Sequence, residues 1–369
     1  MSTPLPPLVD RTFANRLKRR LAAKFQQPAS PPAGGKAVGA GLIGAGNFAR
    51  WAYVPRLRAG FPFKLHAVYD VDAAAAKQAA DATGARLCKS VAEVVGDPAV
   101  EAVFVVTPVK RHYDAVLAAL DAKKHVLCEK PLANDLREAQ VLCERARQLG
   151  CVNMVHFSHR WNAELAFVTQ LVHGGAIGRV HHVTGLLAQG GWFNENNEPS
   201  NERVDAAPWK LGPEGGVVQD LGPHLIDFCR TCFGEVTQVQ ASLKSLRPGA
   251  YVTDDLAGLN LTFADGAVAH VVTSRWATSQ KHRISFEIYG SLGAIHVADT
   301  VRFWKRREPR WRDLLVPVPE KNFLQLFHEG ITKPGTKLPD FLDGMKNNEV
   351  LEAIVRSAKT GAPVALPAA

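Results

Sequence analysis

The sequence lacks the features that assign a chain to several large classes of protein. Its 369 residues include only six cysteines, which are scattered along the chain and do not form the dense framework of a small secreted domain. No apolar run approaches the roughly 20 residues that a membrane-spanning helix needs. There is also no internal repeat or heptad pattern. These absences favour a globular protein with reduced thiols, no membrane span and a cytoplasmic location.

The excess of positive charge is concentrated at the start of the chain. The formal net charge is +9, and residues 1–36 hold seven basic residues against the single acid Asp10, so +6 of that excess lies there. The same segment contains six prolines. It predicts a flexible basic leader, with a surface or targeting anchor as the alternative. The remaining residues have too little excess charge to indicate a nucleic-acid-binding protein.

Strands and helices alternate after the leader. Apolar runs rich in β-branched residues predict strands, and apolar residues spaced three and four apart predict helices. The predicted strands are Ala37–Ile43, Lys64–Tyr69, Ala102–Val106, His125–Cys128 and Val152–His156, and the predicted helices are Phe48–Arg58, Ala73–Thr83, Val91–Val95, His112–Ala122 and Asp135–Leu149. This alternation predicts an α/β domain over residues 37–155, a doubly wound parallel sheet of the Rossmann type with helices on both faces.

The second half of the chain has a different pattern. One predicted helix, Ala163–His173, is followed by runs of strand-like sequence, and Ala264-Asp265-Gly266 is a hairpin-type turn between two of them. The predicted strands are Val180–Leu187, Val236–Leu243, Ala257–Phe263, Ala267–Arg275, His282–Tyr289 and Gly293–Val297. We expect a C-terminal α+β domain over residues 156–369, built on a large, mainly antiparallel open sheet.

A glycine-rich turn joins the first predicted strand to the first predicted helix. The sequence from Gly44 to Ala49 has the pattern G-x-G-x-x-A, in which Gly44 permits a tight turn and Gly46 lets the backbone approach a pyrophosphate. Asp70 ends the second strand, where a carboxylate accepts hydrogen bonds from the adenosine ribose and repels a 2′-phosphate. The pattern favours NAD over NADP. In the alternative interpretation Asp70 caps the following helix, and Asp72 could share either role.

Two further segments follow predicted strands at the carboxyl edge of the sheet, where open α/β sheets bind ligands. Thr107-Pro108 follows one strand, and Glu129-Lys130-Pro131 follows the next. A lysine at this edge can hydrogen-bond a reacting oxygen, and the proline restricts the turn that carries it. Without other evidence, Thr107-Pro108 could simply end a strand and Lys130 could simply be solvated.

These motifs together resemble the Gfo/Idh/MocA family of nicotinamide-dependent sugar and polyol oxidoreductases. The resemblance rests on Gly41 to Gly46, on Thr107-Pro108 with His112, on the segment from His125 to Leu132, and on the segment from Gly215 to Asp227. It extends over residues 37–365.

The resemblance implies a reversible hydride transfer between a secondary alcohol and the nicotinamide. Three residues match the family's catalytic positions: His224 would take the hydroxyl proton, Lys130 would hold the same oxygen, and Asp220 would orient the substrate or the base. Within the sequence, Gly222-Pro223 interrupts the spacing between the last two, so we expect Pro223 to open a helix that contains His224 and Asp220 to lie on the incoming loop.

The resemblance also implies two sets of binding residues. Those expected at the dinucleotide are Gly44, Gly46, Asn47, Phe48, Asp70, Thr107, Pro108, His112, Glu129 and Lys130. Those expected at a carbohydrate-like substrate are Lys130, Arg160, Trp209, Asp220 and His224. A homodimer or homotetramer, assembled through the open sheet, is also implied. Two other functions remain open: an NAD-using glycoside hydrolase of the same superfamily and a non-catalytic dinucleotide-binding sensor.

No metal site is expected. Cys229 and Cys232 have the C-x-x-C spacing, but no second ligand pair accompanies them, and the paired histidines of the sequence have no acidic partners at metal-binding spacing.

Overall fold

The computed structural model describes residues 37–60, 62–190, 215–246, 254–276, 282–308 and 310–367. Their contacts divide them into two compact units. The parallel-sheet unit consists of residues 37–157 and 320–348, and the open-sheet unit consists of the described parts of residues 158–319 and 349–367. Residues 320–348, which the sequence analysis grouped with the second domain, therefore pack with the first unit.

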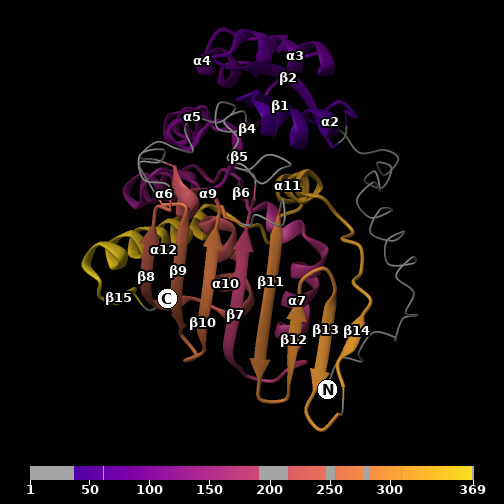
Figure 1. The fold of residues 1–369 in the computed structure, drawn as a ribbon. Helices are drawn as coiled ribbons and strands as arrows, with labels where there is room; N and C mark the ends of the chain where they lie inside the picture. The colour runs from indigo at the N-terminus through magenta and orange to yellow at the C-terminus, as the bar shows by residue number, and fades with distance from the viewer. Residues whose placement is uncertain are drawn as a thin grey trace. The chain divides into compact units, whose positions relative to one another are not determined.

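The parallel-sheet unit is built on six strands, shown in indigo to magenta in Figure 1. All neighbours pair in parallel, in the order β3-β2-β1-β4-β5-β6. The strands are β1 (Val38–Ile43), β2 (Phe63–Tyr69), β3 (Arg86–Leu87), β4 (Ala102–Val105), β5 (His125–Glu129) and β6 (Asn153–His156). This is the doubly wound order, in which the direction of winding reverses between β1 and β4. The predicted α/β fold is confirmed.

The helices of this unit begin and end at residues that favour helix termini. Helix α3 (Ala73–Thr83) starts after Asp72, whose side chain accepts hydrogen bonds from the N–H groups of Ala74 and Ala75, and it ends at Gly84, which has a φ of 72°. The other helices are α4 (Val91–Val95), α5 (His112–Asp121), α6 (Leu136–Leu149) and α11 (Phe323–Thr332), with a short 3-10 turn η2 (Val109–Arg111) before α5.

The first predicted helix is not a regular α-helix. A π-helical turn η1 (Ala49–Tyr53) precedes a short α-helix α2 (Val54–Leu57). Pro55 has no N–H to donate to the carbonyl of Trp51, so the regular i to i−4 ladder cannot continue through this point.

Helix α11 completes the core of the parallel-sheet unit with aromatic side chains. The ring of Phe327 stacks on Phe63 at a centroid distance of 5.8 Å and meets Phe104 edge-on at 6.2 Å. Phe341, at the start of helix α12 (Phe341–Thr360), is buried in the same unit beside Phe157. A segment late in the sequence therefore fills part of the core under the parallel sheet.

The open-sheet unit is built on nine strands in the order β14-β13-β12-β11-β7-β10-β9-β8-β15. They are β7 (Val180–Ala188), β8 (Val236–Lys244), β9 (Leu256–Phe263), β10 (Val268–Ser274), β11 (Arg283–Gly290), β12 (Gly293–Val297), β13 (Val301–Lys305), β14 (Arg312–Leu314) and β15 (Val364–Ala365). Strands β7 and β10 pair in parallel and the other neighbours are antiparallel. The mainly antiparallel sheet and the turn at Ala264–Gly266 between β9 and β10 are confirmed.

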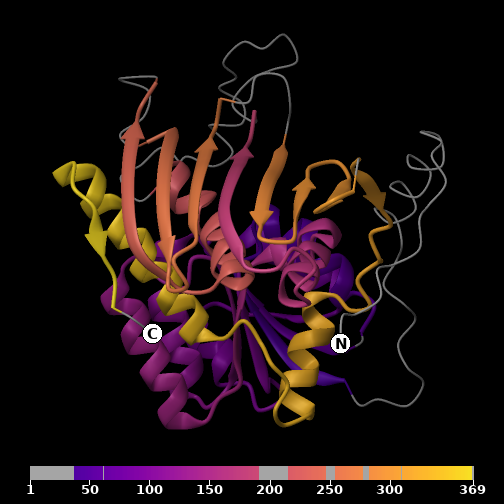
Figure 2. The same ribbon diagram turned by 90° about the horizontal axis from the view of Figure 1, so that it is seen from below.

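Helices cover one face of this sheet. In Figure 2, α7 (Ala163–His173) and α10 (Gly222–Phe233) lie on one side of the strands. Their apolar residues share a core with the strands and with Ile354 of α12. Two shorter elements, the 3-10 turn η3 (Ser158–Trp161) and helix α9 (Gly216–Asp220), precede α7 and α10 respectively. Within the described residues, no helix combines the length and the apolar character of a membrane crossing.

Candidate active site

Four of the predicted site segments meet at one edge of the parallel sheet. The strand register places Ile43 beside both Tyr69 and Val105, and places Val105 beside Cys128. The residues that follow these strand ends therefore lie along the same carboxyl edge. They include Gly44, Asp70, Thr107 and Lys130.

The glycine turn lies at the point where the strand order reverses. Gly44 has a φ of +94°, and a Cβ atom there would lie 2.5 Å from the carbonyl oxygen of Val106, so only glycine fits. A Cβ atom on Gly46 would meet nothing within 4 Å. The backbone at Gly46 thus borders open space, as close approach by a pyrophosphate requires.

Asp70 is tied to the glycine turn and does not cap α3. Its Oδ2 accepts a hydrogen bond from the N–H of Ala45 at 2.5 Å, and its Oδ1 accepts one from the N–H of Asp72 at 2.8 Å. The side chain of Asp72 is the one that caps the helix. The two acids therefore have different structural roles, and the Asp70 carboxylate lies directly beside the turn.

Asn47 and Phe48 follow the glycines and are exposed. The side-chain oxygen of Asn47 accepts a hydrogen bond from Arg50, which also donates to Gln78 of α3 at 3.1 Å. The Phe48 ring lies 5.8 Å from that of Trp51, which is 74% exposed. Arg50 was not among the residues predicted at the dinucleotide, and its guanidinium connects the first helical turn to α3.

His112 connects the two other edge segments from a buried position. Its Nδ1 lies 2.8 Å from the carbonyl oxygen of Pro131, and its Nε2 lies 2.9 Å from that of Thr107. Burial lowers the pKa of His112, although both carbonyls oppose that effect. Both ring nitrogens lie within hydrogen-bonding distance of a backbone carbonyl, so His112 packs between the loops that carry Thr107-Pro108 and Lys130-Pro131 and positions both.

Glu129 is buried, and neighbouring side chains bind its carboxylate. Its Oε1 accepts hydrogen bonds from the hydroxyl of Tyr53 at 2.8 Å and from Nδ1 of His156 at 2.5 Å. Burial by itself raises the pKa of Glu129, but the His156 contact and the Tyr53 hydrogen bond bring it below its ordinary value. The carboxylate therefore anchors the end of β5. Lys130 follows it, half-buried, and joins Pro131 through a cis peptide bond.

The open-sheet unit carries the other two predicted catalytic residues on consecutive helices. Asp220 is the last residue of α9, not part of a loop as expected, because Asp254 accepts hydrogen bonds from the N–H groups of Val217 and Val218 and so caps that helix. Pro223 stands in the first turn of α10 as predicted, and His224 follows it.

Three polar residues that were not predicted, buried Arg275 and half-buried Gln189 and His159, lie beside these two side chains. Asp220 forms an ion pair with Arg275, which also donates to the side-chain oxygen of Gln189 at 3.1 Å. His224 stacks on His159, with ring centroids 4.1 Å apart. Gln189 and Arg275 directly follow β7 and β10, whose parallel pairing brings their ends together.

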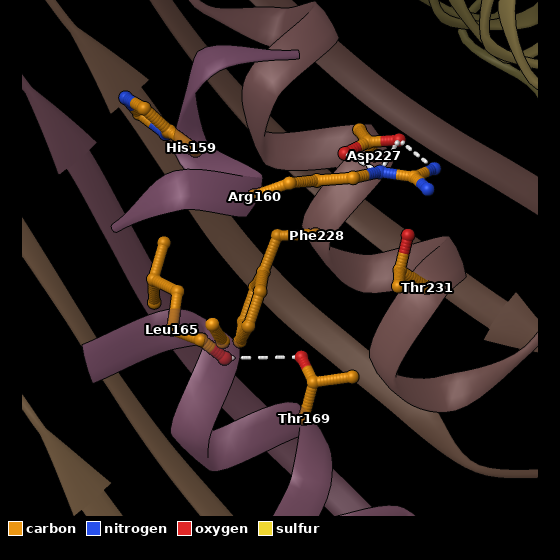
Figure 3. A pocket seen from close by; sticks show the side chains of 8 residues that line it. His159, Arg160, Leu165, Thr169, Asp227, Phe228 and Thr231 are labelled. Carbon is orange, nitrogen blue, oxygen red and sulfur yellow. Dashed lines mark hydrogen bonds and ion pairs between the residues drawn. The ribbon is translucent and has the colours of Figure 1, made fainter. Parts of the chain in front are cut away.

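Arg160 is engaged by a carboxylate. Its Nε and Nη2 donate to Asp227 at distances from 2.6 to 3.2 Å, and the pair lines a pocket of about 190 Å³ together with Phe228 and Thr231 (Figure 3). His159 lies at the same pocket. This arrangement makes Arg160 a part of the support for α10. Trp209, the remaining predicted substrate residue, lies outside the described residues.

The predicted residues thus fall into two sets. Lys130 and the dinucleotide residues belong to the parallel-sheet unit, and Arg160, Asp220 and His224 belong to the open-sheet unit. Among the residues that the structure describes, no group of three or more His, Cys, Asp or Glu side chains is arranged to hold a metal ion.

Comparison with known proteins places both halves of the chain. Residues 38–157 match the family described as "Oxidoreductase family, NAD-binding Rossmann fold", and residues 165–296 match the "GFO/IDH/MocA C-terminal domain". Levoglucosan dehydrogenase from Pseudarthrobacter phenanthrenivorans is 28% identical over 324 residues, which cover 74% of this chain and 82% of the relative. The scyllo-inositol 2-dehydrogenase (NAD(+)) of Bacillus subtilis is 26% identical over 289 residues, 74% of this chain and 80% of the relative.

A solved structure of levoglucosan dehydrogenase in complex with NADH and levoglucosan has a TM-score of 0.79 and 25% identity, and the match covers 90% of this chain and 100% of that one. The chain is therefore an oxidoreductase that combines a dinucleotide-binding parallel sheet with a large open sheet. Since the two family matches extend over more than half of its length, it belongs to the Gfo/Idh/MocA family. The predicted resemblance is confirmed.

Proposed function

We propose that this protein is an NAD-dependent dehydrogenase that transfers hydride between a secondary alcohol of a sugar, polyol or sugar derivative and the nicotinamide. The observation that carries this proposal is the glycine turn at the β1/β4 switch point, with Asp70 hydrogen-bonded to it. The named relatives with a known substrate, levoglucosan and scyllo-inositol dehydrogenases, support the carbohydrate part of the proposal.

The residues at this edge fit NAD. The space beside Gly46 and the amide groups of the first helical turn suit a pyrophosphate, because the N–H groups of a first turn have no acceptor within their helix. Each oxygen of the Asp70 carboxylate has two acceptor positions, so it can accept from a ribose hydroxyl while it keeps its bond to Ala45. A 2′-phosphate would meet this negative charge, which favours NAD over NADP.

Three side chains would act on the substrate. NAD, when bound, supplies the hydride acceptor or donor at its nicotinamide. His224 takes the proton of the substrate hydroxyl in oxidation and returns it in reduction, because an imidazole exchanges protons near neutral pH. Lys130 holds the same oxygen as a hydrogen-bond donor. Asp220, held by Arg275, accepts a hydrogen bond from the substrate and fixes its orientation.

The test is NAD reduction by the purified protein across polyols, aldoses, anhydrosugars and nucleotide sugars. The expected result is turnover that falls by about 10²–10⁴ in Lys130→Ala and His224→Ala, the usual contribution of a positioned acid or base. NAD affinity, measured by calorimetry, should remain within a few-fold of that of the unmodified protein in His224→Ala. Cleavage of chromogenic glycosides without net NADH, or tight NAD binding without turnover on any compound, would refute the proposal.

We also propose that the protein acts in the cytoplasm as a homodimer or homotetramer. All six cysteines are free, and five of them are buried, which suits a reducing compartment. Assembly through the open sheet is supported by two apolar residues on its face. Exposed Val272 and half-buried Leu186 lie beside each other there, since they are partners in the β7–β10 register. Light scattering coupled to size-exclusion chromatography measures the mass, and a monomer at micromolar concentration would contradict this assembly.

A further inference from the structure

We propose that Arg275 is a positioning residue for the reaction, which holds the Asp220 carboxylate ionised and in one orientation toward the substrate. This inference rests on the proposed function, because it assigns Asp220 a place in the same active site. Arg275 has no recognisable motif around it, and it lies 55 positions from Asp220 in the sequence.

Both members of the Asp220–Arg275 pair are buried. The side chain of Arg275 is 6% exposed and that of Asp220 is 8% exposed. A carboxylate in such surroundings is costly to keep charged unless a cation compensates it, and the guanidinium supplies that compensation. An Asp220 that is already paired is a poor proton acceptor. The base function is thereby left to His224, and Asp220 serves as a fixed hydrogen-bond acceptor.

Arg275 is itself held at several points. Its N–H donates to the carbonyl oxygen of Asp255 at 2.9 Å, and its Nη1 donates to Gln189 at 3.1 Å. Asp255, directly before β9, therefore fixes the backbone of this residue, and Gln189, directly after β7, holds its guanidinium. A guanidinium restrained in this way can hold a carboxylate in one orientation, which a flexible lysine ammonium does not do.

The segment Asp254-Asp255, which binds the backbone of Arg275, also holds the helix that carries Asp220. Asp254 accepts hydrogen bonds from the first turn of α9, through its carbonyl oxygen to Val217 and through Oδ2 to Val218. Asp254 and Asp255 are adjacent, so one segment fixes the helix that carries Asp220 and the next peptide unit fixes Arg275. The two charged groups are thus set relative to each other by a common support, as expected for a pair whose geometry matters.

The experiment compares Arg275→Met, Arg275→Lys and the control Arg230→Met. Arg230 is a matched residue in the same unit: its side chain is 4% exposed, it pairs with Glu235 at 2.6 Å, and it stands in α10 six positions after His224. We expect Arg275→Met to lower kcat by about 100-fold and Arg275→Lys to restore part of that loss, whereas Arg230→Met destabilises the fold and keeps kcat within about twofold. The substrate is the compound of the panel that the unmodified protein oxidises fastest.

A double-mutant cycle separates positioning from a purely structural role. If Arg275 acts through Asp220, the double variant Asp220→Asn with Arg275→Met loses no more kcat than the worse single variant. If the kcat losses of the two single variants multiply in the double variant, the inference is overturned. It is also overturned if Arg230→Met loses as much kcat as Arg275→Met.

A second readout does not depend on turnover. Hydrogen exchange of residues 216–220 should be faster in Arg275→Met than in Arg230→Met, and equal exchange would also overturn the inference. If the unmodified protein oxidises no compound of the panel, the proposed function fails, while the exchange comparison still decides whether Arg275 positions Asp220.

Discussion

Replacement of Asp70 tests the connection between the glycine turn and coenzyme choice. In Asp70→Ala, the N–H of Ala45 loses an acceptor at 2.5 Å and the N–H of Asp72 loses one at 2.8 Å. A hydrogen bond to a charged group contributes about 1.5–3 kcal/mol, so loss of one such bond to the ribose lowers NAD affinity by roughly 10- to 150-fold. NADP affinity should fall much less, because the repulsion of the 2′-phosphate is removed together with the carboxylate.

Isothermal calorimetry with NAD and with NADP measures both affinities directly. The matched control is Asp72→Ala, which removes the cap of α3 and costs about 1 kcal/mol of stability without touching the turn. It should leave the ratio of the two affinities unchanged. If Asp70→Ala also leaves that ratio unchanged, the carboxylate does not select the coenzyme and its hydrogen bond to the turn is only structural.

Three other variants test the site. Gly46→Ala should fold like the unmodified protein and bind NAD at least tenfold more weakly, because a Cβ there meets no protein atom but occupies the space beside the turn; Gly44→Ala should instead lower the melting temperature sharply, since its Cβ would lie 2.5 Å from a backbone oxygen. Equal NAD affinity in Gly46→Ala would place the pyrophosphate elsewhere. The pKa of Glu129 is lowered, so its contribution to stability is present above its unfolded value near 4.5 and is lost as the pH falls through the lower folded value. Urea unfolding from pH 7 to pH 3 should therefore show a shallower decline in Glu129→Gln than in the unmodified protein, and parallel curves would contradict this account. His112→Phe should raise the KM for NAD more than it lowers kcat, because the ring lies between the carbonyls of two loops, Thr107 and Pro131, and positions those loops. Steady-state kinetics measures both constants, and a loss confined to kcat would contradict this role.

The parts of the fold that were predicted correctly have local signals. Helix Ala73–Thr83 was predicted at its observed bounds because Asp72 and Gly84, which begin and end it, stand next to it in the sequence.

Helix α11 was not predicted, although its sequence signal is local too. Asn322 and Gln325 form a capping box, in which each side chain binds the other residue's backbone N–H.

The parts that were not predicted depend on partners that are distant in sequence. Asp220 was expected on a loop, but Asp254, 36 positions beyond Val218, caps a helix there. The pairing of Asp220 with Arg275 likewise depends on residues distant in sequence, because Asp254 caps α9 and the neighbouring Asp255 binds the backbone N–H of Arg275. Glu129 was expected at the coenzyme, and its carboxylate is engaged by His156, 27 positions away. Motifs identified the strand ends, whereas the hydrogen-bond partners of their side chains follow from the tertiary fold.

The place of α11 in the core has a consequence for the order in which the protein forms during synthesis. The rings of Phe63 and Phe104 are covered by Phe327, and Phe157 shares its core with Phe341. A nascent chain that ends before residue 320 has every strand of the parallel sheet but exposes this aromatic surface. The half of the protein that is made first is therefore completed almost last, and until then it offers chaperones an apolar patch on an otherwise assembled sheet.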